Sequence, residues 1–366
     1  MGSAAASHLA KRGLSVVGVE QFEPGHDQGS SHGLSRIIRL AYFEHPAYVP
    51  LLRRAFTLWR ELEEESGSGV QLLHVTGGLD AGVPGSRVFE GSRESCRVHG
   101  LQHEVLKAGE VNERFPGFSL PDGFMAVFQP DAGFLEPEKC IRAYAASAAK
   151  HGAELRTGER VHGWGIEASG VVLHTAGGEI HARQLVVTAG AWTPRLIPSL
   201  ATLLRPERQV VGWFSVEDAN AFAVGRFPVF VMTTPDGHFY GFPEYGVPGF
   251  KIGKYHHRSE FVDPDGMRRD VDAGDESVLR DCVRSFFPRA NGPLIRASTC
   301  MFTNSPDEHF IIDRLPGAPE VLLVSACSGH GFKFCSVVGE MVADLVERGR
   351  TAHDTSLFRI DRFSLA

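Results

Sequence analysis

The chain has 366 residues, of which 43% are hydrophobic and 22% charged, and this composition excludes a disordered or fibrous protein. A net charge of -7 at pH 7 argues against non-specific nucleic-acid binding, and no apolar stretch approaches the roughly 20 residues needed to span a bilayer. The six cysteines form no Cys-x-x-Cys pair and the 17 histidines form no His-Glu-x-x-His pattern, so we expect no metal site. The length favours two domains, or one large domain with a smaller one.

The N-terminal segment has the features of the second half of a dinucleotide-binding strand–helix–strand unit. Residues 1–13 predict a helix that begins with small side chains and ends at a glycine, and residues 14–20 predict a short strand that ends in an acid. Gly2 is the candidate third glycine of a Gly-x-Gly-x-x-Gly fingerprint, and Glu20 is the candidate ligand of a ribose. The first strand and the first two glycines would lie upstream of Met1, so we expect a truncated chain or a start assigned at an internal methionine. An ordinary alanine-rich helix is the alternative.

Further along, helix signals occur towards both ends and strand signals dominate the middle. Helices are predicted at 48–65, 136–150, 276–287 and 337–348. The strand at 185–188 runs into a tight Ala-Gly-Ala turn that permits close approach of a flat or phosphorylated ligand, although a plain strand–turn–helix has the same pattern. Alternation over 209–252 predicts an antiparallel sheet with one wet or ligand-facing side. We therefore expect an α/β chain, α+β overall, with a second domain inserted into a nucleotide-binding layer.

Two arginines, Arg36 and Arg39, flank a pair of isoleucines after a loop rich in Gly, Ser and His at 24–35. They share a face if the segment is helical and point to opposite faces if it is extended. Arginine beside buried apolar residues suits bidentate capture of a carboxylate or phosphate. The alternative is a surface pair in a chain that uses arginine far more often than lysine.

Lys251 alternates with Phe250 and Ile252 in a strand pattern, so its side chain is predicted to face away from theirs. If that face lines a cavity, a desolvated lysine supplies a local positive charge. A solvated lysine on a wet face is the alternative. Cys300 lies in another strand pattern, and its spacing alone indicates a core thiol.

A loop with glycines at alternate positions, Gly329 and Gly331, follows an apolar strand pattern and precedes the last predicted helix. Such a loop exposes backbone N–H groups to an anion, and Lys333 adds positive charge. Because Phe332 and Phe334 flank the lysine, a partly buried site is favoured over a plain helix-initiating loop.

These segments form a series of motifs in a fixed order along the chain. They are Met-Gly-Ser-Ala-Ala-Ala, Ser-His-Gly with Arg-Ile-Ile-Arg, Ala-Gly-Ala-Trp, Tyr-Gly-Phe-Pro, Phe-Lys-Ile-Gly, Cys-Met-Phe-Thr with Asp-Glu-His-Phe-Ile-Ile-Asp, and Ser-Gly-His-Gly-Phe-Lys-Phe. Together they resemble the monomeric sarcosine oxidase and N-methyltryptophan oxidase family of flavoproteins, over essentially the whole chain. The last two motifs are the most specific.

The resemblance implies a Rossmann-like FAD-binding domain with an inserted antiparallel-sheet substrate domain. We expect the first at 1–66, 133–206 and 310–366, and the second at 67–132 and 207–309. It implies an FAD enzyme that oxidises the C–N bond of secondary amino acids such as sarcosine, N-methyltryptophan or pipecolate. Oxygen would be the acceptor and hydrogen peroxide the product.

The resemblance also assigns roles to single residues. It implies a covalent 8α-S-cysteinyl link from the flavin to Cys300. The implied catalytic residues are Lys251 at the oxygen site, Arg36 near the flavin ring and Tyr240. The implied substrate ligands are Arg39, Lys333 and Gly329. The implied cofactor-binding residues are Gly2, Glu20, Val161, Cys300, Gly331 and Lys333.

Three positions depart from the pattern of that family, Leu34, Tyr255 and Phe302, and they leave the substrate open. One alternative is an N-terminally truncated, non-catalytic paralogue. Another is a flavin amine dehydrogenase with a different electron acceptor, against which the presence of Lys251 argues. The expected partners are a small amino acid and O2, without nucleic acid or membrane. We expect a monomer in the cytoplasm, since no secretory leader is visible.

Overall fold

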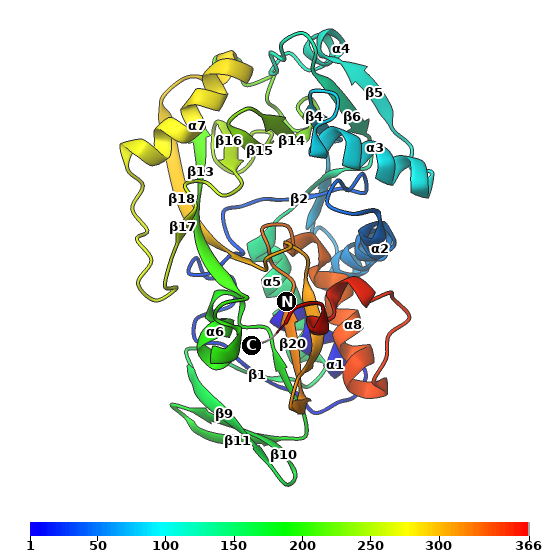
Figure 1. Ribbon diagram of the computed structural model, residues 1–366, viewed down its shortest axis with the longest axis vertical. Coiled ribbons are helices and arrows are strands. Elements are labelled where there is room, and N and C mark those ends of the chain that lie inside the picture. The colour runs from blue at the N-terminus through cyan, green and yellow to red at the C-terminus, as the bar shows by residue number, and fades with distance from the viewer. Residues whose placement is uncertain (365–366) are drawn as a thin grey trace.

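The computed structural model describes residues 1–364 as two connected parts (Figure 1). The lower part of the view holds both ends of the chain, and the upper part holds a large sheet. The lower helices are α1 (Gly2–Lys11), α2 (Val49–Ser66), α5 (Pro137–Lys150), α6 (Thr193–Leu196) and α8 (Cys335–Arg348). The upper helices are α3 (Arg87–His99), α4 (Ala108–Arg114) and α7 (Ala273–Phe286). No helix within residues 1–364 combines the length and apolar character needed to cross a bilayer.

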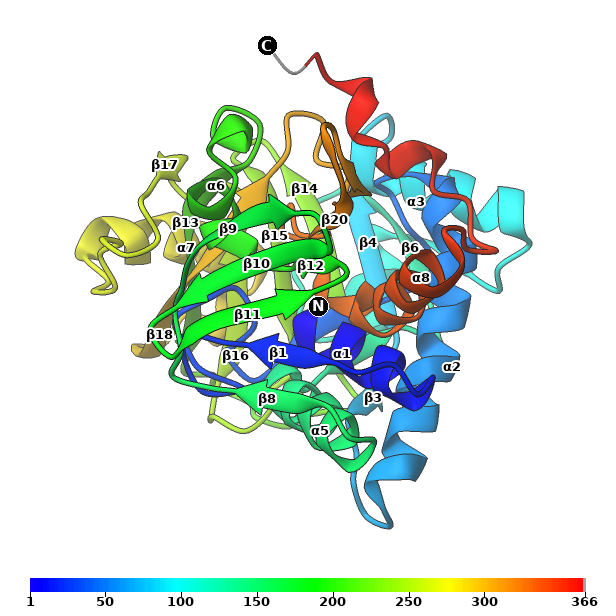
Figure 2. The ribbon, with the colours of Figure 1, turned by 90° about the horizontal axis from the view of Figure 1, so that it is seen from below.

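Short strands, paired in parallel except for β19 with β20, build the layer of the lower part. These strands are β1 (Val17–Val19), β8 (Glu154–Arg156), β12 (Leu185–Val187), β19 (Ile311–Leu315) and β20 (Ala318–Ser325). Within residues 1–364 they form two separate sheets, β1–β8 and β12–β20–β19, in which β1 pairs with β8 and β12 with β20 in parallel. Figure 2 shows β1 and β8 side by side, with α1 next to them. Segments far apart in sequence therefore complete the layer, which confirms the predicted α/β class.

A nine-stranded sheet forms the upper part within residues 1–364, in the order β17-β13-β16-β15-β14-β4-β6-β5, with β18 also on β13. Its central strands are β13 (Arg205–Phe214), β14 (Val229–Thr234), β15 (Gly237–Phe242), β16 (Phe250–Lys254) and β18 (Leu294–Asn304). The others are β4 (Gly78–Gly82), β5 (Glu104–Lys107), β6 (Met125–Gln129) and β17 (Glu260–Phe261). Pairing is antiparallel except between β4 and β14, in agreement with the predicted sheet.

The two faces of this sheet have different surroundings. Phe250 and Ile252 point into an aromatic-rich core that also contains residues of α4 and α7. Because side chains alternate along a strand, Lys251 points the other way, which confirms the orientation predicted for it. This second face carries the residues of the candidate site.

Two smaller sheets complete the fold. They are β2 (Arg36–Ile38), β7 (Gly133–Leu135) and β3 (Leu73–Val75), and the meander of β9 (Val161–Glu167), β10 (Gly170–Thr175) and β11 (Gly178–Ala182). Single-turn 3-10 helices occur at Pro46–Tyr48, Gly190–Trp192, Pro198–Leu200, Pro288–Ala290, Phe332–Phe334 (η5), Ser356–Phe358 and Ile360–Arg362. β2 is extended and ends at Ile38, one residue before Arg39. Arg36 lies beside Lys251 and Cys300, whereas Arg39 contacts Glu44 and Asp80, so the two arginines do not share a helical face. The division into domains at the predicted boundaries stays a prediction.

Candidate active site

The second face of the upper sheet brings together three residues that the sequence analysis selected. The register between β15 and β16 places Tyr240 and Lys251 on this face. Cys300 on β18 pairs with Gln209 on β13. Lys251 pairs with Trp213, four residues further along β13, so Cys300 and Lys251 share the face. Sheet register thus gathers residues that are up to 60 positions apart in the sequence.

Lys251 is fully buried and is held by uncharged oxygen atoms. Its Nζ donates to the carbonyl oxygen of Gly33 at 2.6 Å, to Ser35 Oγ at 2.9 Å and to the Ser35 carbonyl at 3.1 Å. The ring of Phe242 lies 4.3 Å from this nitrogen. Burial, and then the nearby charge of Arg36, lower the pKa of Lys251 well below its usual value. The side chain is therefore a desolvated amine or ammonium, not the solvated lysine of the alternative hypothesis.

Arg36 lies beside Lys251 and Cys300. Its guanidinium donates to the carbonyl oxygens of Ser30 at 2.7 Å and Ser35 at 2.8 Å. Burial raises the pKa of the Cys300 thiol, and the positive charges of Arg36 and Lys251 act against that rise. The structure thus places the Arg36 guanidinium and the desolvated Lys251 around a buried thiol, a setting that favours the thiolate more than an apolar core would.

Arg39 is 3% exposed and forms the centre of a second cluster. Its Nη2 donates to the two carboxylate oxygens of Glu44 at 3.1 and 3.3 Å, and its Nε lies 3.4 Å from Asp80 Oδ1. The rings of Tyr42 and Phe43 lie 4.7 and 4.8 Å from the guanidinium carbon. Neither Nε nor Nη1 makes a hydrogen bond with any of residues 1–364. Since buried donors are normally satisfied, these nitrogens fit an anionic ligand.

Lys333 is the second buried cation of this cluster. Its Nζ donates to the carbonyl oxygen of His330 at 2.7 Å and lies 5.3 Å from the centre of the Tyr42 ring. Burial, and then the charge of Arg39, lower the pKa of Lys333 to about 7, and Glu44 and Asp80 oppose that shift. Arg39 and Lys333 therefore contact the same aromatic ring, Tyr42, although they are far apart in sequence.

The hydrogen bonds of His330 fix its tautomer and so the position of Tyr42. His330 Nε2 lies 2.9 Å from the carbonyl oxygen of Glu308, which can only accept, so Nε2 carries the proton. His330 Nδ1 is then an acceptor, and the Tyr42 hydroxyl donates to it at 2.6 Å. Burial lowers the pKa of His330 to about 4, which keeps the ring neutral at pH 7. Sequence analysis gave His330 and Tyr42 no role.

Gly329 and Gly331 shape the loop that carries Lys333. Gly329 has a φ of +75°, and a side chain there would also meet the Phe302 ring. At Gly331 a Cβ atom would lie 1.7 Å from the carbonyl oxygen of Ala326, so that only glycine fits. The two glycines thus set the path of the backbone between β20 and η5.

The predicted nucleotide-binding residues lie in the lower part. A Cβ atom at Gly2 would lie 2.8 Å from Thr188 Oγ1, at the end of β12, so the glycine permits the close helix–strand approach that the sequence predicts. Glu20, just after β1, accepts a hydrogen bond from the Phe22 backbone at 3.0 Å. The Glu20 carbonyl also accepts from the backbone N–H of residue 159, just before Val161, where β9 begins.

The two clusters of the upper face adjoin through Tyr255. Its ring lies 5.2 Å from that of Tyr240 and 5.8 Å from that of Phe302. Both Arg39 and Tyr240 influence the pKa of Tyr255, which burial raises above the usual tyrosine value. The face that carries Lys251 and Cys300 is therefore continuous with the cluster around Arg39.

Two acids of the second cluster, Glu44 and Asp80, were given no role from the sequence. Glu44 follows the arginine pair closely, which could have indicated a partner for Arg39. Asp80 is a charged residue in the middle of an otherwise uncharged strand, Gly78–Gly82, and that contrast is the signal that could have identified it.

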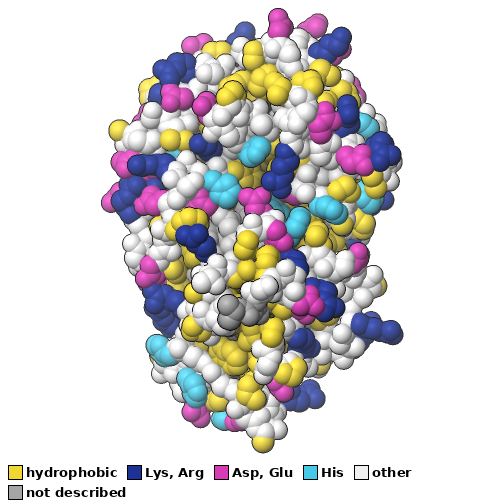
Figure 3. Space-filling model, viewed as in Figure 1, with side chains coloured by type: hydrophobic (Ala, Val, Ile, Leu, Met, Phe, Trp, Pro, Cys, Tyr) yellow, Lys and Arg dark blue, Asp and Glu magenta, His cyan; other side chains and the backbone are white. Residues whose placement is uncertain are grey.

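Charged side chains link the two parts of the molecule at the surface. Figure 3 shows histidine, basic and acidic side chains gathered across the middle of the molecule. Glu308 contacts Arg87 of α3 at 3.2 Å and His256 at 3.0 Å, and His256 also contacts Glu207 at 2.7 Å. Hydrogen bonds to Glu207 and Glu308 raise the pKa of His256 to about 10, so this bridge is charged at pH 7.

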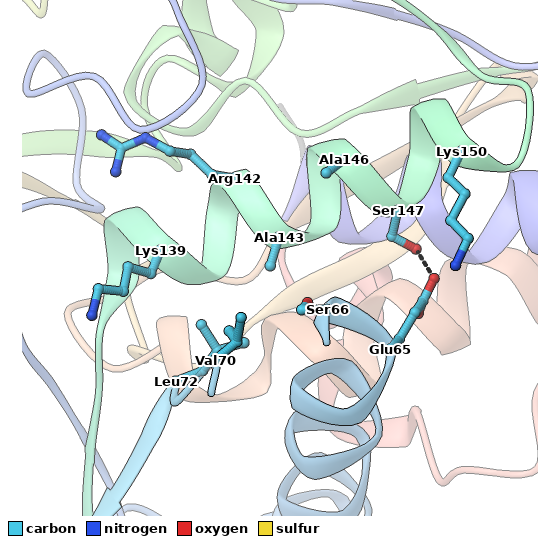
Figure 4. A pocket seen from close by; sticks show the side chains of 10 residues that line it. All are labelled: Glu65, Ser66, Val70, Leu72, Lys139, Arg142, Ala143, Ala146, Ser147 and Lys150. Atoms are coloured by element: carbon cyan, nitrogen blue, oxygen red, sulfur yellow. Dashed lines mark hydrogen bonds between the residues drawn. The ribbon is translucent and has the colours of Figure 1, made fainter. Parts of the chain in front are cut away.

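A surface hollow of about 480 Å³ lies between the end of α2 and α5 (Figure 4). The acid that lines this hollow, Glu65, accepts a hydrogen bond from the Ser147 hydroxyl at 2.7 Å and also binds the ammonium of Lys11. The negative charge of Glu65 is therefore already compensated. The hollow is lined by Glu65, Ser66, Val70, Leu72, Lys139, Arg142, Ala143, Ala146, Ser147 and Lys150. None of these is a predicted site residue.

Comparison with known proteins agrees with this arrangement. The family described as FAD dependent oxidoreductase matches residues 1–345. Monomeric sarcosine oxidase of Bacillus sp. (strain NS-129) is 40% identical over the whole chain and 95% of the relative. N-methyl-L-tryptophan oxidase of Yersinia pestis (strain Pestoides F) is 33% identical over 99% of this chain and 96% of the relative.

Solved structures show the same fold. The open form of NikD, an unusual amino acid oxidase essential for nikkomycin biosynthesis, is 25% identical with a TM-score of 0.82, covering 98% of this chain and 94% of its own. Glycine oxidase from Geobacillus kaustophilus superposes with a TM-score of 0.81 at 22% identity, over 99% of this chain and 96% of its own, a likeness of fold alone.

Proposed function

The chain belongs to the FAD dependent oxidoreductase family, with FAD as its cofactor, and we propose that it oxidises secondary amino acids with O2 as the acceptor. Sarcosine, N-methyltryptophan and pipecolate represent its substrate class, and hydrogen peroxide is the second product. The observation that carries this proposal is the pair of buried cations, Arg39 and Lys333, adjoining the sheet face that holds Lys251 and Cys300.

The chain's own residues fit FAD. In the lower part, the close approach of Gly2 to Thr188 and the position of Glu20 just after β1 suit the nucleotide half, and the Glu20 carbonyl accepts from the backbone of residue 159, two residues before Val161 at the start of β9. In the upper part, Cys300 supplies a thiol for a covalent link, and two cations oppose its desolvation. When bound, FAD would supply the acceptor for the two electrons that the substrate loses as its C–N bond becomes a C=N double bond.

Arg39 and Lys333 bind the substrate carboxylate. The guanidinium of Arg39 offers donors in a fixed plane, in which Nη1 makes no hydrogen bond within residues 1–364 and Nε contacts Asp80 at 3.4 Å, and Lys333 offers a compact charge. Two cations on one anion fix its orientation, which places the C–N bond in one position relative to Tyr240 and Gly329. Because the cluster is buried, these interactions are stronger than they would be in water.

Lys251 and Arg36 stabilise negative charge that develops during oxygen reduction. Lys251 on the second face of the upper sheet and Arg36 on β2 both act on Cys300, and Lys251 is locked in place by three hydrogen bonds. A cation that is fixed in advance needs no reorganisation when charge appears. This arrangement favours an oxidase over a flavin dehydrogenase that uses another acceptor.

The test is to load the purified protein with FAD and to measure peroxide formation with sarcosine, N-methyltryptophan and pipecolate. We expect peroxide from at least one of them, and much less from glycine, a primary amine of the same charge. Turnover with an artificial dye but without peroxide would support the dehydrogenase, and a colourless protein that never binds FAD would support the non-catalytic paralogue.

We also propose that the enzyme is a monomer. The curated relatives that are about 40% identical are named monomeric sarcosine oxidase. Size-exclusion chromatography with light scattering would give about 40 kDa for a monomer, since the chain has a mass of 39.9 kDa.

A further inference from the structure

Asp80 is a buried acid that the proposed mechanism does not use. It lies on β4, is 3% exposed, and accepts a hydrogen bond from Ser92 Oγ of α3 at 2.5 Å. Its other oxygen lies 3.4 Å from Arg39 Nε. Since that nitrogen makes no hydrogen bond within residues 1–364, Asp80 contacts Arg39 by charge alone.

Arg39 therefore lies between two carboxylates, Glu44 at Nη2 and Asp80 at Nε. If Arg39 binds a substrate carboxylate, as in the proposed function, a third anion enters the same buried space. Like charges that share a buried site disfavour each other's ionised form, and one of them gains a proton. Asp80 is the candidate for this proton, because Glu44 keeps two hydrogen bonds from Nη2 and Asp80 has none from Arg39.

The surroundings of Asp80 come from several elements. Its neighbours on the adjacent strands, Val231 of β14 and Val127 of β6, are apolar. The polar and titratable groups around it are Arg39 and Glu44 after β2, Ser92 and Cys96 of α3, Tyr255 after β16, and Lys333 of η5. Burial raises the pKa of Asp80 to about 6, with Arg39 opposing that rise, so a further anion acts on a group that is already close to protonation at neutral pH.

We propose that Asp80 is a positioning residue that competes with the substrate carboxylate for Arg39 and takes up one proton from solvent when that carboxylate binds. This rests on the proposed role of Arg39 as the carboxylate ligand. The affinity for carboxylates then falls as the pH rises above neutrality, because Asp80 must be protonated at increasing cost. Asp80 thus sets the pH range in which the site accepts an amino acid.

The experiment uses the FAD-loaded enzyme and methoxyacetate, which has the shape of sarcosine but an ether oxygen in place of the amine. It carries no group that titrates near neutral pH, so the proton count reports on groups of the enzyme, Asp80 and Lys333 among them. Calorimetric titrations at pH 6.5 in two buffers of different ionisation enthalpy give the number of protons taken up per ligand bound. The matched variants are Asp80→Asn and Glu44→Gln, which remove one acid each.

We expect the unmodified enzyme to take up roughly one proton, most of it on Asp80, whose pKa is about 6, and the remainder on Lys333, whose pKa is about 7. Asp80→Asn should lose most of the proton uptake and bind methoxyacetate more tightly at pH 8, whereas Glu44→Gln should retain most of the uptake.

An uptake near one proton in Asp80→Asn, or its loss in Glu44→Gln alone, would overturn the inference. So would the absence of proton uptake in the unmodified enzyme, a result that needs no variant to fold. If the unmodified holoenzyme does not bind methoxyacetate at all, the carboxylate clamp itself is wrong, and that failure is distinct from normal binding without proton uptake.

Discussion

Lys251 Nζ lies 2.6 Å from the carbonyl oxygen of Gly33, and this contact joins the upper sheet to the loop that precedes β2. Gly33 has a φ of +95°, and its backbone N–H donates to Glu138 at 2.6 Å. A helix of the lower part, α5, thereby holds the loop that holds the lysine. The position of the buried cation is thus determined by both parts of the molecule.

The substitution Lys251→Met should slow reoxidation by O2 far more than reduction by substrate, by roughly a hundredfold, because a fixed charge worth a few kcal/mol is lost. Stopped-flow measurement of the two half-reactions checks this. Lys254→Met is the matched control, since Lys254 lies three residues along β16 and points to the other face. Equal slowing of both half-reactions would contradict the assigned role.

Arg39→Ala should raise KM for carboxylated amines by roughly a hundredfold or more, because removing one partner of a buried charged hydrogen bond costs about 2–5 kcal/mol. Arg53→Ala, on the exposed side of α2, should leave KM unchanged. A secondary amine without a carboxylate gives the discriminating comparison, because it has no group for Arg39 to bind. Arg39→Ala and Arg53→Ala should therefore oxidise it at the same low rate. An unchanged KM in Arg39→Ala would remove the clamp.

The sequence predicts what depends on local pattern. Strand alternation gives the direction of Lys251, and the glycine spacing at 329–331 indicates the loop that carries Lys333. The local pattern of the sequence cannot predict that β4 pairs with β14, since these strands are about 150 residues apart. It also cannot predict that Asp80 on β4 lies near Arg39. Contacts of this kind depend on sheet register, which no local pattern encodes.

The same limit explains other residues that were missed. Whether Arg36 and Arg39 share a face stays open until the backbone of β2 is known to be extended. Tyr42 and His330 are 288 positions apart, and only the fold shows their hydrogen bond. Gly2 and Glu20 are predicted to bind the nucleotide because their motif is contiguous in sequence, and that role stays a prediction.

Cys300→Ser should leave the flavin bound without a covalent bond, so that acid precipitation releases it into the supernatant. Before the substitution, the flavin should stay with the precipitated protein, because a thioether survives acid. Cys327→Ser is the matched control, since Cys327 is a free cysteine after β20 and carries no assigned role. Release of flavin from the unmodified protein would contradict the covalent link at Cys300.

Asp275 anchors α7 beneath the upper sheet, and its removal should destabilise the fold. Arg208 donates to Asp275 at 2.8 and 3.0 Å, and both side chains are fully buried. Asp275→Ala leaves a buried guanidinium without its partner, so we expect a loss of about 3–5 kcal/mol. Glu276→Ala, next in sequence and bound to the less buried Arg280, should cost less than about 1 kcal/mol.

The pH dependence of this loss follows from the pKa of Asp275. Burial alone would raise that pKa, but hydrogen bonds from Arg208 and from the backbone of residue 272 hold it below its usual value. A carboxyl group with a lowered folded-state pKa stabilises the protein above its unfolded pKa of about 4, and that contribution is lost as the pH falls further. Thermal unfolding should therefore show a large difference between the unmodified protein and Asp275→Ala at pH 7 and a smaller one at pH 3. A difference that is constant across this range would show that the ion pair does not stabilise α7.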